Sequence, residues 1–178
     1  MKKIIAFGAS SSSTSINQQF AKWAASQLEE VEVALLDLND FEMPIYSSDR
    51  ETADGIHEKA RQFKTHVEGA DGILISFAEH NGSYSSAFKN VFDWMSRLGL
   101  PIWSDKPMFL MGTSPGGRGA ATVLETAANA IPHQGGVVVA RFSLPSFGQN
   151  FDAVNGIIDE DLKSEFQAQA EKFREAMK

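Results

Sequence analysis

Short apolar runs alternate with helical patterns from one end of the chain to the other. The apolar runs are rich in Ile, Val, Leu and Phe, and they cover residues 4–7, 31–36, 72–77, 108–111 and 137–140. Continuous apolar runs of this length are typical of parallel strands that are covered on both faces. The pattern therefore predicts five buried strands.

The segments between these runs carry apolar residues at helical spacing, and each such stripe is expected to pack against the sheet. In chain order the stripes are Ile16, Phe20, Trp23 and Ala24; Ile56, Ala60, Phe63 and Val67; Tyr84, Ala87, Phe88, Val91, Phe92 and Met95; Ala121, Leu124, Ala128 and Ile131; and Ile158, Leu162, Phe166, Ala170, Phe173 and Met177. Five β/α units with right-handed crossovers predict an α/β fold. We expect a flavodoxin-like three-layer sandwich, in which a five-stranded parallel sheet of order 2-1-3-4-5 has helices on both faces. No linker interrupts the alternation, so one domain is expected over residues 1–178.

Composition narrows the class of protein. Hydrophobic residues make up 43% of the 178 residues and charged residues 22%, which fits a folded domain with a full core. The chain has no cysteine, which excludes disulfides, thiol nucleophiles and thiolate metal sites. The net charge is −7 and there is no basic run, so nucleic acid is not an expected partner.

The first residues form a short apolar run that is followed by serines, which predicts a buried first strand rather than a signal peptide. No apolar run approaches the roughly 20 residues that a membrane helix needs. We therefore expect no membrane partner and a cytoplasmic location.

The first candidate loop follows the first expected strand. Gly8 and Ala9 lead into residues 10–15, all of which carry hydroxyls, and Asn17 adds an amide. Hydroxyls and free N–H groups at a helix start can bind a phosphate dianion. The alternative is a serine-rich N-cap region, because Ser and Thr favour caps. The loop matches neither a P-loop nor G-x-G-x-x-G, which disfavours a nucleoside triphosphate or a Rossmann-bound NAD and leaves a single monophosphate.

The second candidate loop follows the third expected strand and contains Asn81 and Gly82. Both residues tolerate positive φ, which aims successive N–H groups into a cleft at the strand end, where open α/β sheets bind ligands. The alternative is an ordinary strand-to-helix turn with Ser83 as N-cap. Lys89 and Asn90, one to two turns further on, are expected on an exposed helix face.

The third candidate loop, residues 112–119, follows the fourth expected strand and reads Gly-Thr-Ser-Pro-Gly-Gly-Arg-Gly. Its glycines let the backbone approach a planar ligand closely. Arg118 adds one positive charge, and the alternative for it is an exposed side chain without a ligand. The first, third and fourth strands are neighbours in the predicted order. The three loops therefore predict one cleft, which is a stronger signal than any loop alone.

Other chemistries have little support. The four histidines show no metal-ligand spacing, and no G-x-S-x-G nucleophile elbow is present. Phe7, Gly8 and Ala9 stand where a phosphoacceptor receiver domain needs acidic residues. We nominate no metal ligand and no catalytic side chain.

The three loops together resemble a known family. Residues 79–83 (Glu-His-Asn-Gly-Ser) and 89–94 (Lys-Asn-Val-Phe-Asp-Trp) resemble the P-E-Y-N-G-S…L-K-N-A-I-D-W signature of the NADPH-dependent FMN reductases. The segment from Gly8 to Asn17 resembles their phosphate loop, and residues 112–119 resemble their second flavin loop. The match runs in order over residues 3–140.

The resemblance implies an enzyme with FMN as cofactor, in which hydride passes from NADPH (or NADH) to flavin N5 and a small-molecule acceptor then takes two electrons. Family acceptors include quinones, azo dyes, metal oxyanions and free flavins, and the sequence does not choose between them. The implied cofactor-binding residues are Ser10, Ser15, Ile16, Asn17, Ala78, Glu79, His80, Asn81, Gly82, Ser83, Ser114, Pro115, Gly116, Gly117 and Arg118. Ser10, Ser15 and Asn17 would hold the phosphate. Residues 79–83 would line the isoalloxazine ring, and residues 114–117 would line its pyrimidine edge. Arg118 is also a candidate contact to a phosphate of NADPH.

The resemblance also implies a homodimer or homotetramer. Trp94, Arg97, Trp103 and residues 39–52 are candidate contact residues. A core position is the alternative for Trp94.

The chain departs from the family pattern at the second loop. Ala78 and His80 stand where the family has proline and tyrosine, and Ser85 and Ser86 stand where it has proline and glycine. Two rival hypotheses stay open: a flavodoxin-type electron carrier without its own nicotinamide turnover, and a relative that has lost its flavin. Carriers often shield the flavin with aromatic side chains. The third loop has none, which favours the enzyme.

Overall fold

Five strands form one parallel sheet in the computed structural model, which describes residues 1–177. They are β1 (Lys2–Ala9), β2 (Val31–Leu35), β3 (Gly72–Phe77), β6 (Lys106–Thr113) and β7 (Gly136–Leu144). Their spatial order is β2-β1-β3-β6-β7, and every neighbouring pair is parallel. Counted along the chain, this is the order 2-1-3-4-5, so the predicted topology is confirmed.

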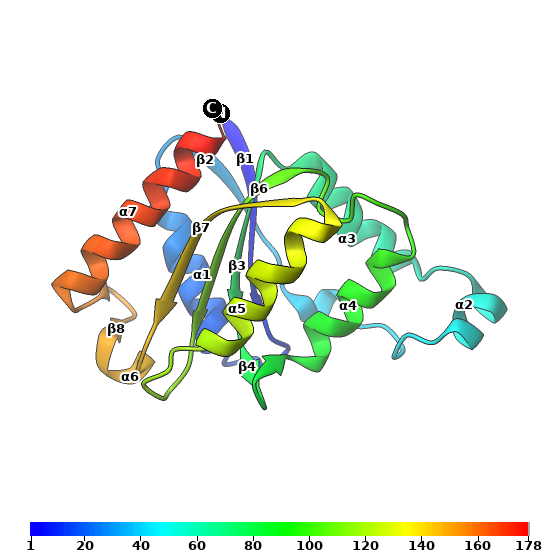
Figure 1. The fold of residues 1–178 in the computed structure, drawn as a ribbon, viewed down its shortest axis with the longest axis horizontal. Helices are drawn as coiled ribbons and strands as arrows, with labels where there is room; N and C mark the ends of the chain where they lie inside the picture. The colour runs from blue at the N-terminus through cyan, green and yellow to red at the C-terminus, as the bar shows by residue number, and fades with distance from the viewer. Residues whose placement is uncertain (178) are drawn as a thin grey trace.

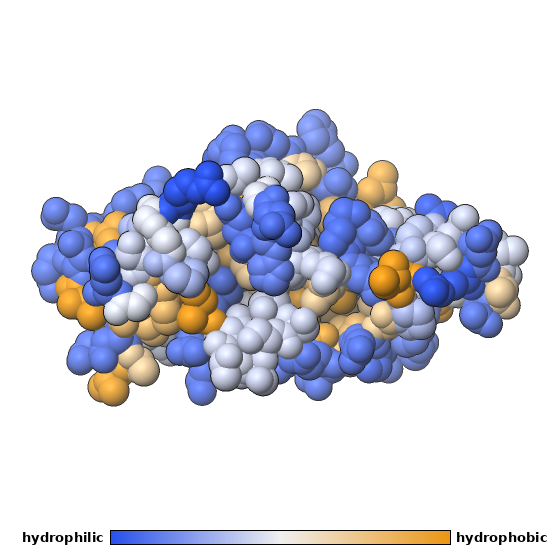
Figure 2. All heavy atoms as spheres, turned by 90° about the horizontal axis from the view of Figure 1, so that it is seen from below, coloured by the Kyte–Doolittle hydropathy of each residue, from blue (hydrophilic) through white to orange (hydrophobic). Residues whose placement is uncertain are grey.

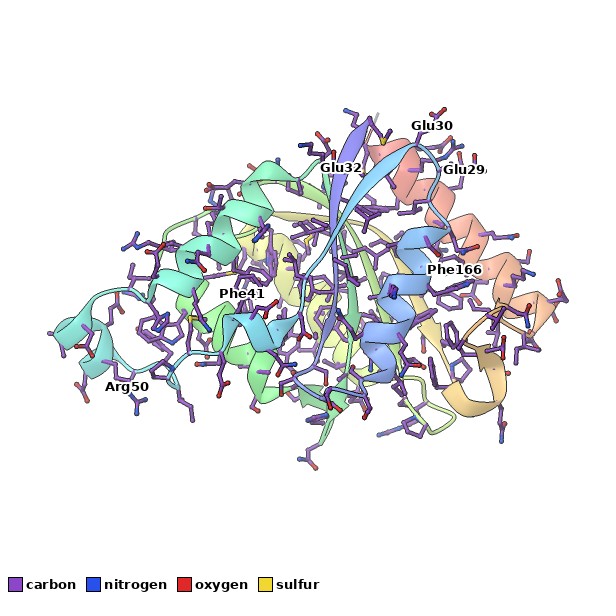
Figure 3. All side chains as sticks on the ribbon, turned by 180° about the vertical axis from the view of Figure 1, so that it is seen from behind. Glu29, Glu30, Glu32, Phe41, Arg50 and Phe166 are labelled. Atoms are coloured by element: carbon purple, nitrogen blue, oxygen red, sulfur yellow. The ribbon has the colours of Figure 1, made fainter. Side chains whose placement is uncertain are left out.

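Helices cover both faces of the sheet (Figure 1). One face carries α1 (Ile16–Ser26) and α7 (Glu160–Ala176), and the other carries α3 (Glu58–Gly69), α4 (Ser86–Ser96) and α5 (Ala121–Ala130). Successive residues of a strand point to opposite faces, so Ile5 and Phe7 enter one hydrophobic cluster while Ile4 and Ala6 enter the other. Figure 3 shows Phe166 reaching from α7 toward α1 in the second cluster.

The expectation that all five strands are covered on both faces is wrong in part for the edge strand β7, where Val137 is 49% exposed, and it is wrong throughout for β2. None of its residues is buried, and the side chains of Val33 and Leu35 are 38% and 41% exposed. The strand pairs only with β1, so it forms an edge of the sheet, and none of its residues except Val31 packs against either hydrophobic cluster of residues 1–177. An apolar run alone does not distinguish an edge strand from a central one.

Several short elements have no counterpart in the sequence pattern. They are η1 (Leu38–Phe41), α2 (Ser48–Asp54), β4 (Glu79–His80), β5 (Ser83–Tyr84), η2 (Ile131–Gln134), α6 (Phe147–Asn150), β8 (Phe151–Asp152) and β9 (Gly156–Ile157). Three helices, α3, α4 and α7, begin later than their stripes predict, because capping side chains set the start. The His57 ring accepts from the Lys59 N–H at the start of α3, and the Asp159 carboxylate accepts from the Leu162 N–H at the start of α7.

The chain between η1 and α3 extends away from the body as an arm with α2 at its tip (Figure 1). No residue of α2 is buried, and Arg50 lies at this far end (Figure 3). The base of the arm is held by α4. The Asn90 amide donates to the Met43 carbonyl over 3.0 Å and accepts from the Tyr46 N–H over 2.9 Å. Asn90 is therefore not on a freely exposed helix face.

A polar cluster joins the arm to the end of α4. Glu51 accepts from the Tyr46 hydroxyl over 2.9 Å and from Arg97 over 2.8 Å. Partial burial pushes the pKa of Glu51 up, but these two hydrogen bonds outweigh it and hold the pKa below its usual value. The indole of Trp94 donates to the Pro44 carbonyl over 2.8 Å.

The tryptophans proposed as partner contacts belong to the core. Trp103 is 0% exposed and Trp94 is 2% exposed, and both lie in the cluster under α4. The assignment of Trp103 as a surface contact is therefore wrong, and for Trp94 the alternative of a core position is confirmed. Among residues 1–177, no helix is both long and apolar enough to span a membrane.

Candidate functional site

Three loops meet at the edge of the sheet where the strands end. We name them the serine loop (residues 10–15, after β1), the hairpin loop (residues 78–85, after β3) and the glycine loop (residues 114–120, after β6). Figure 2 looks onto this edge, and its centre is pale, the colour of residues of intermediate hydropathy such as serine, threonine and glycine. These loops carry the residues that the sequence nominates.

The serine loop presents unpaired N–H groups at the start of α1. The N–H groups of Ser11, Ser13, Ile16 and Asn17 have no acceptor among residues 1–177, while the Ser15 hydroxyl accepts from the Gln18 N–H over 3.1 Å as N-cap. The first turn of α1 carries no acidic residue. Free N–H groups, hydroxyls and the positive end of a helix dipole form a site for an anion.

Gly8 lets α1 approach the strand end closely. A Cβ at this position would lie 2.4 Å from the backbone nitrogen of Gln18. Gln18 in turn accepts from the Gly8 N–H and donates to the Leu36 carbonyl over 2.8 Å. The start of the serine loop is therefore held against the first turn of α1 by the contacts of Gln18.

Asn17 is an internal brace of this edge. It is 3% exposed, its Oδ1 accepts from the Ser76 hydroxyl over 2.8 Å and from the Thr113 N–H over 3.1 Å, and its Nδ2 donates to the Thr113 carbonyl over 3.1 Å. These bonds join α1 to the ends of β3 and β6. The side chain is thus occupied within the protein, and its main-chain N–H is the part of Asn17 that is free for a phosphate.

The hairpin loop is a small β-hairpin. Asn81 and Gly82 have φ of +53° and +73° and form the two-residue turn between β4 and β5. Consecutive positive φ values are those of a type I′ turn, for which Asn-Gly is the favoured pair. The sequence predicted the positive φ but missed the hairpin, because its strands have only two residues each.

Ser85, and not Ser83, caps α4. Its hydroxyl accepts from the Phe88 N–H over 3.2 Å and donates to the Ala9 carbonyl over 2.7 Å. The serine that replaces the family's proline therefore starts the helix and ties it to the end of β1. Tyr84, expected on the helix, lies in β5, where burial raises the pKa of its hydroxyl. Lys89 is on the exposed face as expected and pairs with Asp93 at 2.7 Å.

The glycine loop is braced through its carbonyl groups, which leaves N–H groups free. The Ser114 and Gly116 carbonyls accept from the Phe147 and Ser146 N–H groups, each over 3.0 Å. The N–H groups of Gly116, Gly117 and Arg118 have no acceptor among the described residues. The loop can therefore donate to a ligand without giving up internal hydrogen bonds.

Gly116 and Gly117 face open space. A Cβ added at either residue would meet nothing within 4 Å, and neither residue has a positive φ. Nothing in the fold of this chain requires glycine at these positions. A ligand that lies close to the backbone would require it.

Hydrogen bonds tie the loops and the start of α1 to neighbouring strand ends and to α5. Ser85 links the hairpin loop to the end of β1, Asn17 links the start of α1 to the end of β6, and Glu79 accepts from the Val123 N–H of α5 over 2.9 Å. Of the nominated residues, Ala78 is buried, whereas Pro115, Gly116, Gly117, His80, Asn81 and Ser83 are exposed at this edge. Arg118 is 80% exposed, with one guanidinium nitrogen 3.6 Å from Glu79.

The fold and these loops define a flavodoxin-like protein with free N–H donors at the strand ends. The sequence model of the NADPH-dependent FMN reductases matches residues 2–151, and the chain belongs to this family. The predicted family resemblance is therefore confirmed, and with it the assignment of FMN as the family's cofactor.

Named relatives agree with this family. A 2-hydroxy-1,4-benzoquinone reductase from Burkholderia sp is 41% identical over 80 residues, which are 44% of this chain and 43% of the relative. An NADPH azoreductase from Bacillus sp. (strain OY1-2) is 32% identical over 122 residues, 64% of each chain. Each match spans less than two thirds of the relative. The structure of FerB, a flavoenzyme NAD(P)H:(acceptor) oxidoreductase from Paracoccus denitrificans, superposes with a TM-score of 0.80 at 28% identity, covering 99% of this chain and 97% of that one.

Proposed function

We propose that this protein is an FMN-dependent oxidoreductase that takes electrons from NADPH or NADH and passes them to a small-molecule acceptor. Quinones, azo compounds, metal oxyanions and free flavins are the candidate acceptors. The observation that carries the proposal is the set of free N–H groups in the serine and glycine loops, which hydrogen bonds hold at one edge. The reductase names of the relatives support the same class of reaction.

The chain's own donors fit the two polar ends of FMN. The serine loop offers N–H groups and hydroxyls with no nearby acidic residue in the first turn, which suits a phosphate dianion. The glycine loop offers three N–H groups beside two open glycines, which suits the polar edge of a flat ring. We assign the phosphate to the serine loop and the ring to the other two loops.

Bound FMN supplies the redox chemistry, and the protein binds and orients it. The N–H groups of Gly116, Gly117 and Arg118 would stabilise negative charge that develops at the ring's polar edge. Asn81 and Gly82 present backbone rather than a bulky side chain beside the ring. No side chain has to act as a general base in this scheme.

Anaerobic reduction tests the proposal directly. The purified protein should be yellow with near-stoichiometric FMN, and NADPH should bleach it rapidly in stopped flow without a partner protein. A colourless protein that also fails to bind added FMN would contradict the proposal. Bleaching that needs a separate reductase would support the electron-carrier alternative.

Arg118→Ala should raise the KM for NADPH about fivefold to tenfold and leave the KM for NADH unchanged. Arg118 is the one permanent cation within the serine, hairpin and glycine loops. Its guanidinium is 80% exposed and has a 3.6 Å pairing with Glu79, so its exposed side can meet the additional phosphate of NADPH. The matched control is Lys89→Ala, which removes an exposed cation already paired with Asp93. Steady-state kinetics with both nicotinamides checks this, and an equal shift for the two donors would contradict it.

We further propose a cytoplasmic homodimer or homotetramer. The unburied helix α2 and Ile45, which is 77% exposed, support the arm as a contact with a second copy. Sizing chromatography with light scattering gives the mass directly. Ile45→Asp should shift the mass toward the monomer, and an unchanged mass would count against the arm as the contact.

A further inference from the structure

Glu79 lies in the loop that would line the flavin, yet its side chain turns away from solvent. The side chain is 10% exposed, and Oε2 accepts from the Val123 N–H over 2.9 Å. The Arg118 guanidinium lies 3.6 Å from Oε1. The contacts of the carboxylate are therefore with the glycine loop and the start of α5.

Helix α5 lacks a cap of its own. The residue at its N-cap position is Ala120, in a left-handed conformation with φ of +61°, and it makes no side-chain hydrogen bond to the helix. The first turn of α5 contains no acidic residue. A carboxylate at a helix start satisfies a free N–H group and interacts favourably with the helix dipole. Glu79 provides this cap from a different loop.

The cap fixes the hairpin loop relative to the glycine loop. On its other side, the glycine loop is held by β7, since the Ser143 hydroxyl of that strand donates to the Gly119 carbonyl over 2.8 Å. Among residues 1–177, this is the one side-chain hydrogen bond that joins the hairpin loop to α5. Loss of the Glu79 cap would therefore loosen the spacing of the two loops at this point.

We propose that Glu79 is a positioning residue, which caps α5 and thereby sets the spacing of the two loops that receive the flavin ring. The role rests on the proposed function, because it concerns the FMN site. It differs from the direct ring contact that the sequence implies for residue 79. The carboxylate acts through the loops and not through a bond to the cofactor.

Two variants separate positioning from direct contact. Glu79→Ala removes the cap and should weaken FMN binding about tenfold, the effect of losing one helix cap. Glu79→Gln keeps an oxygen that can accept from Val123 N–H and should stay within about threefold of the parent protein. Glu125→Ala is the matched control, because Glu125 lies on the exposed face of the same helix. FMN affinity is measured by fluorescence quenching.

Amide hydrogen exchange of the flavin-free protein supplies a readout that does not depend on FMN. Exchange at residues 118–124 should be about tenfold faster in Glu79→Ala than in the parent, and unchanged in Glu79→Gln. Equal loss of FMN affinity in both variants would overturn the proposal, because it would indicate a direct role of the charge. Faster exchange with unchanged FMN affinity would overturn it as well. A parent protein that binds no FMN would defeat the proposed function, while the exchange data would still test the cap.

Discussion

Asn17→Ala should lower the free energy of unfolding by about 3–5 kcal/mol, because it leaves buried polar groups without partners. The lost side-chain amide accepts hydrogen bonds from the Ser76 hydroxyl and the Thr113 N–H, and it donates one to the Thr113 carbonyl. Ser76 and Thr113 are 0% and 1% exposed, so water cannot easily replace the missing partner. A buried donor or acceptor left unpaired costs about 1–3 kcal/mol.

Urea denaturation followed by circular dichroism measures this loss. Asn129→Ala is the control, because Asn129 is exposed and its amide meets only Glu125, over 3.1 Å. It should change the free energy of unfolding by less than about 0.5 kcal/mol. If Asn17→Ala were as stable as this control, the brace would not contribute to the fold as described.

The same substitution should also weaken FMN binding. The brace fixes the start of α1 against the ends of β3 and β6, so its loss displaces the N–H groups of Ile16 and Asn17 from their positions. We expect FMN affinity at low urea to fall at least tenfold. Unchanged affinity would contradict a role of the first turn of α1 in phosphate binding.

Ser13→Asp should weaken FMN binding about 10- to 100-fold while the fold stays intact. The new carboxylate would stand among the free N–H groups of the serine loop and repel a phosphate dianion. Two like charges about 4 Å apart repel by about 4 kcal/mol at an effective dielectric of 20, and exposure to solvent reduces this value. The side chain of Ser13 is exposed and makes no hydrogen bond within residues 1–177.

Two controls identify the cause of that loss. The side chain introduced by Ser13→Asn has nearly the same shape as that of Ser13→Asp but no charge. This variant should bind FMN within about threefold of the parent. Riboflavin lacks the phosphate, so its affinity should be equal in the Asp and Asn variants. The melting temperature of Ser13→Asp should not fall, because a carboxylate near a helix start is favourable. If Ser13→Asp lost riboflavin affinity to the same extent as FMN affinity, the serine loop would not be the phosphate-binding site.

Hydrophobic spacing predicted the strands of the sheet because the central strands are apolar and covered by two clusters, and the number of β/α units predicted their order. It did not predict the exposure of β2, since burial of an edge strand depends on neighbours that are distant in sequence. The hairpin at Asn81 and Gly82 was missed for a related reason. Its strands have only two residues each, which is too short to show the alternating hydrophobic pattern of a β-strand.

At the site, residue types identified the loops but not the direction of individual side chains. The free N–H groups of the serine loop follow from its position at a helix start, which the sequence indicates. The internal bonding of Asn17 and the turn of Glu79 toward α5 depend on β6 and α5, which lie far along the chain. The predicted stripe begins too early, at Tyr84; with Tyr84 set aside, Ser85 stands just before the remaining stripe and is a recognisable N-cap.

The two ends of the described chain have a practical consequence for electrochemistry. Figure 1 shows them side by side at the edge of the sheet opposite the three loops, and Met177 lies against Gly72 at the start of β3. A tag or surface linker joined at either end would therefore anchor the molecule with the three loops directed into the bulk solution. Freely diffusing nicotinamides and dyes would reach an immobilised film of this protein without obstruction by the support.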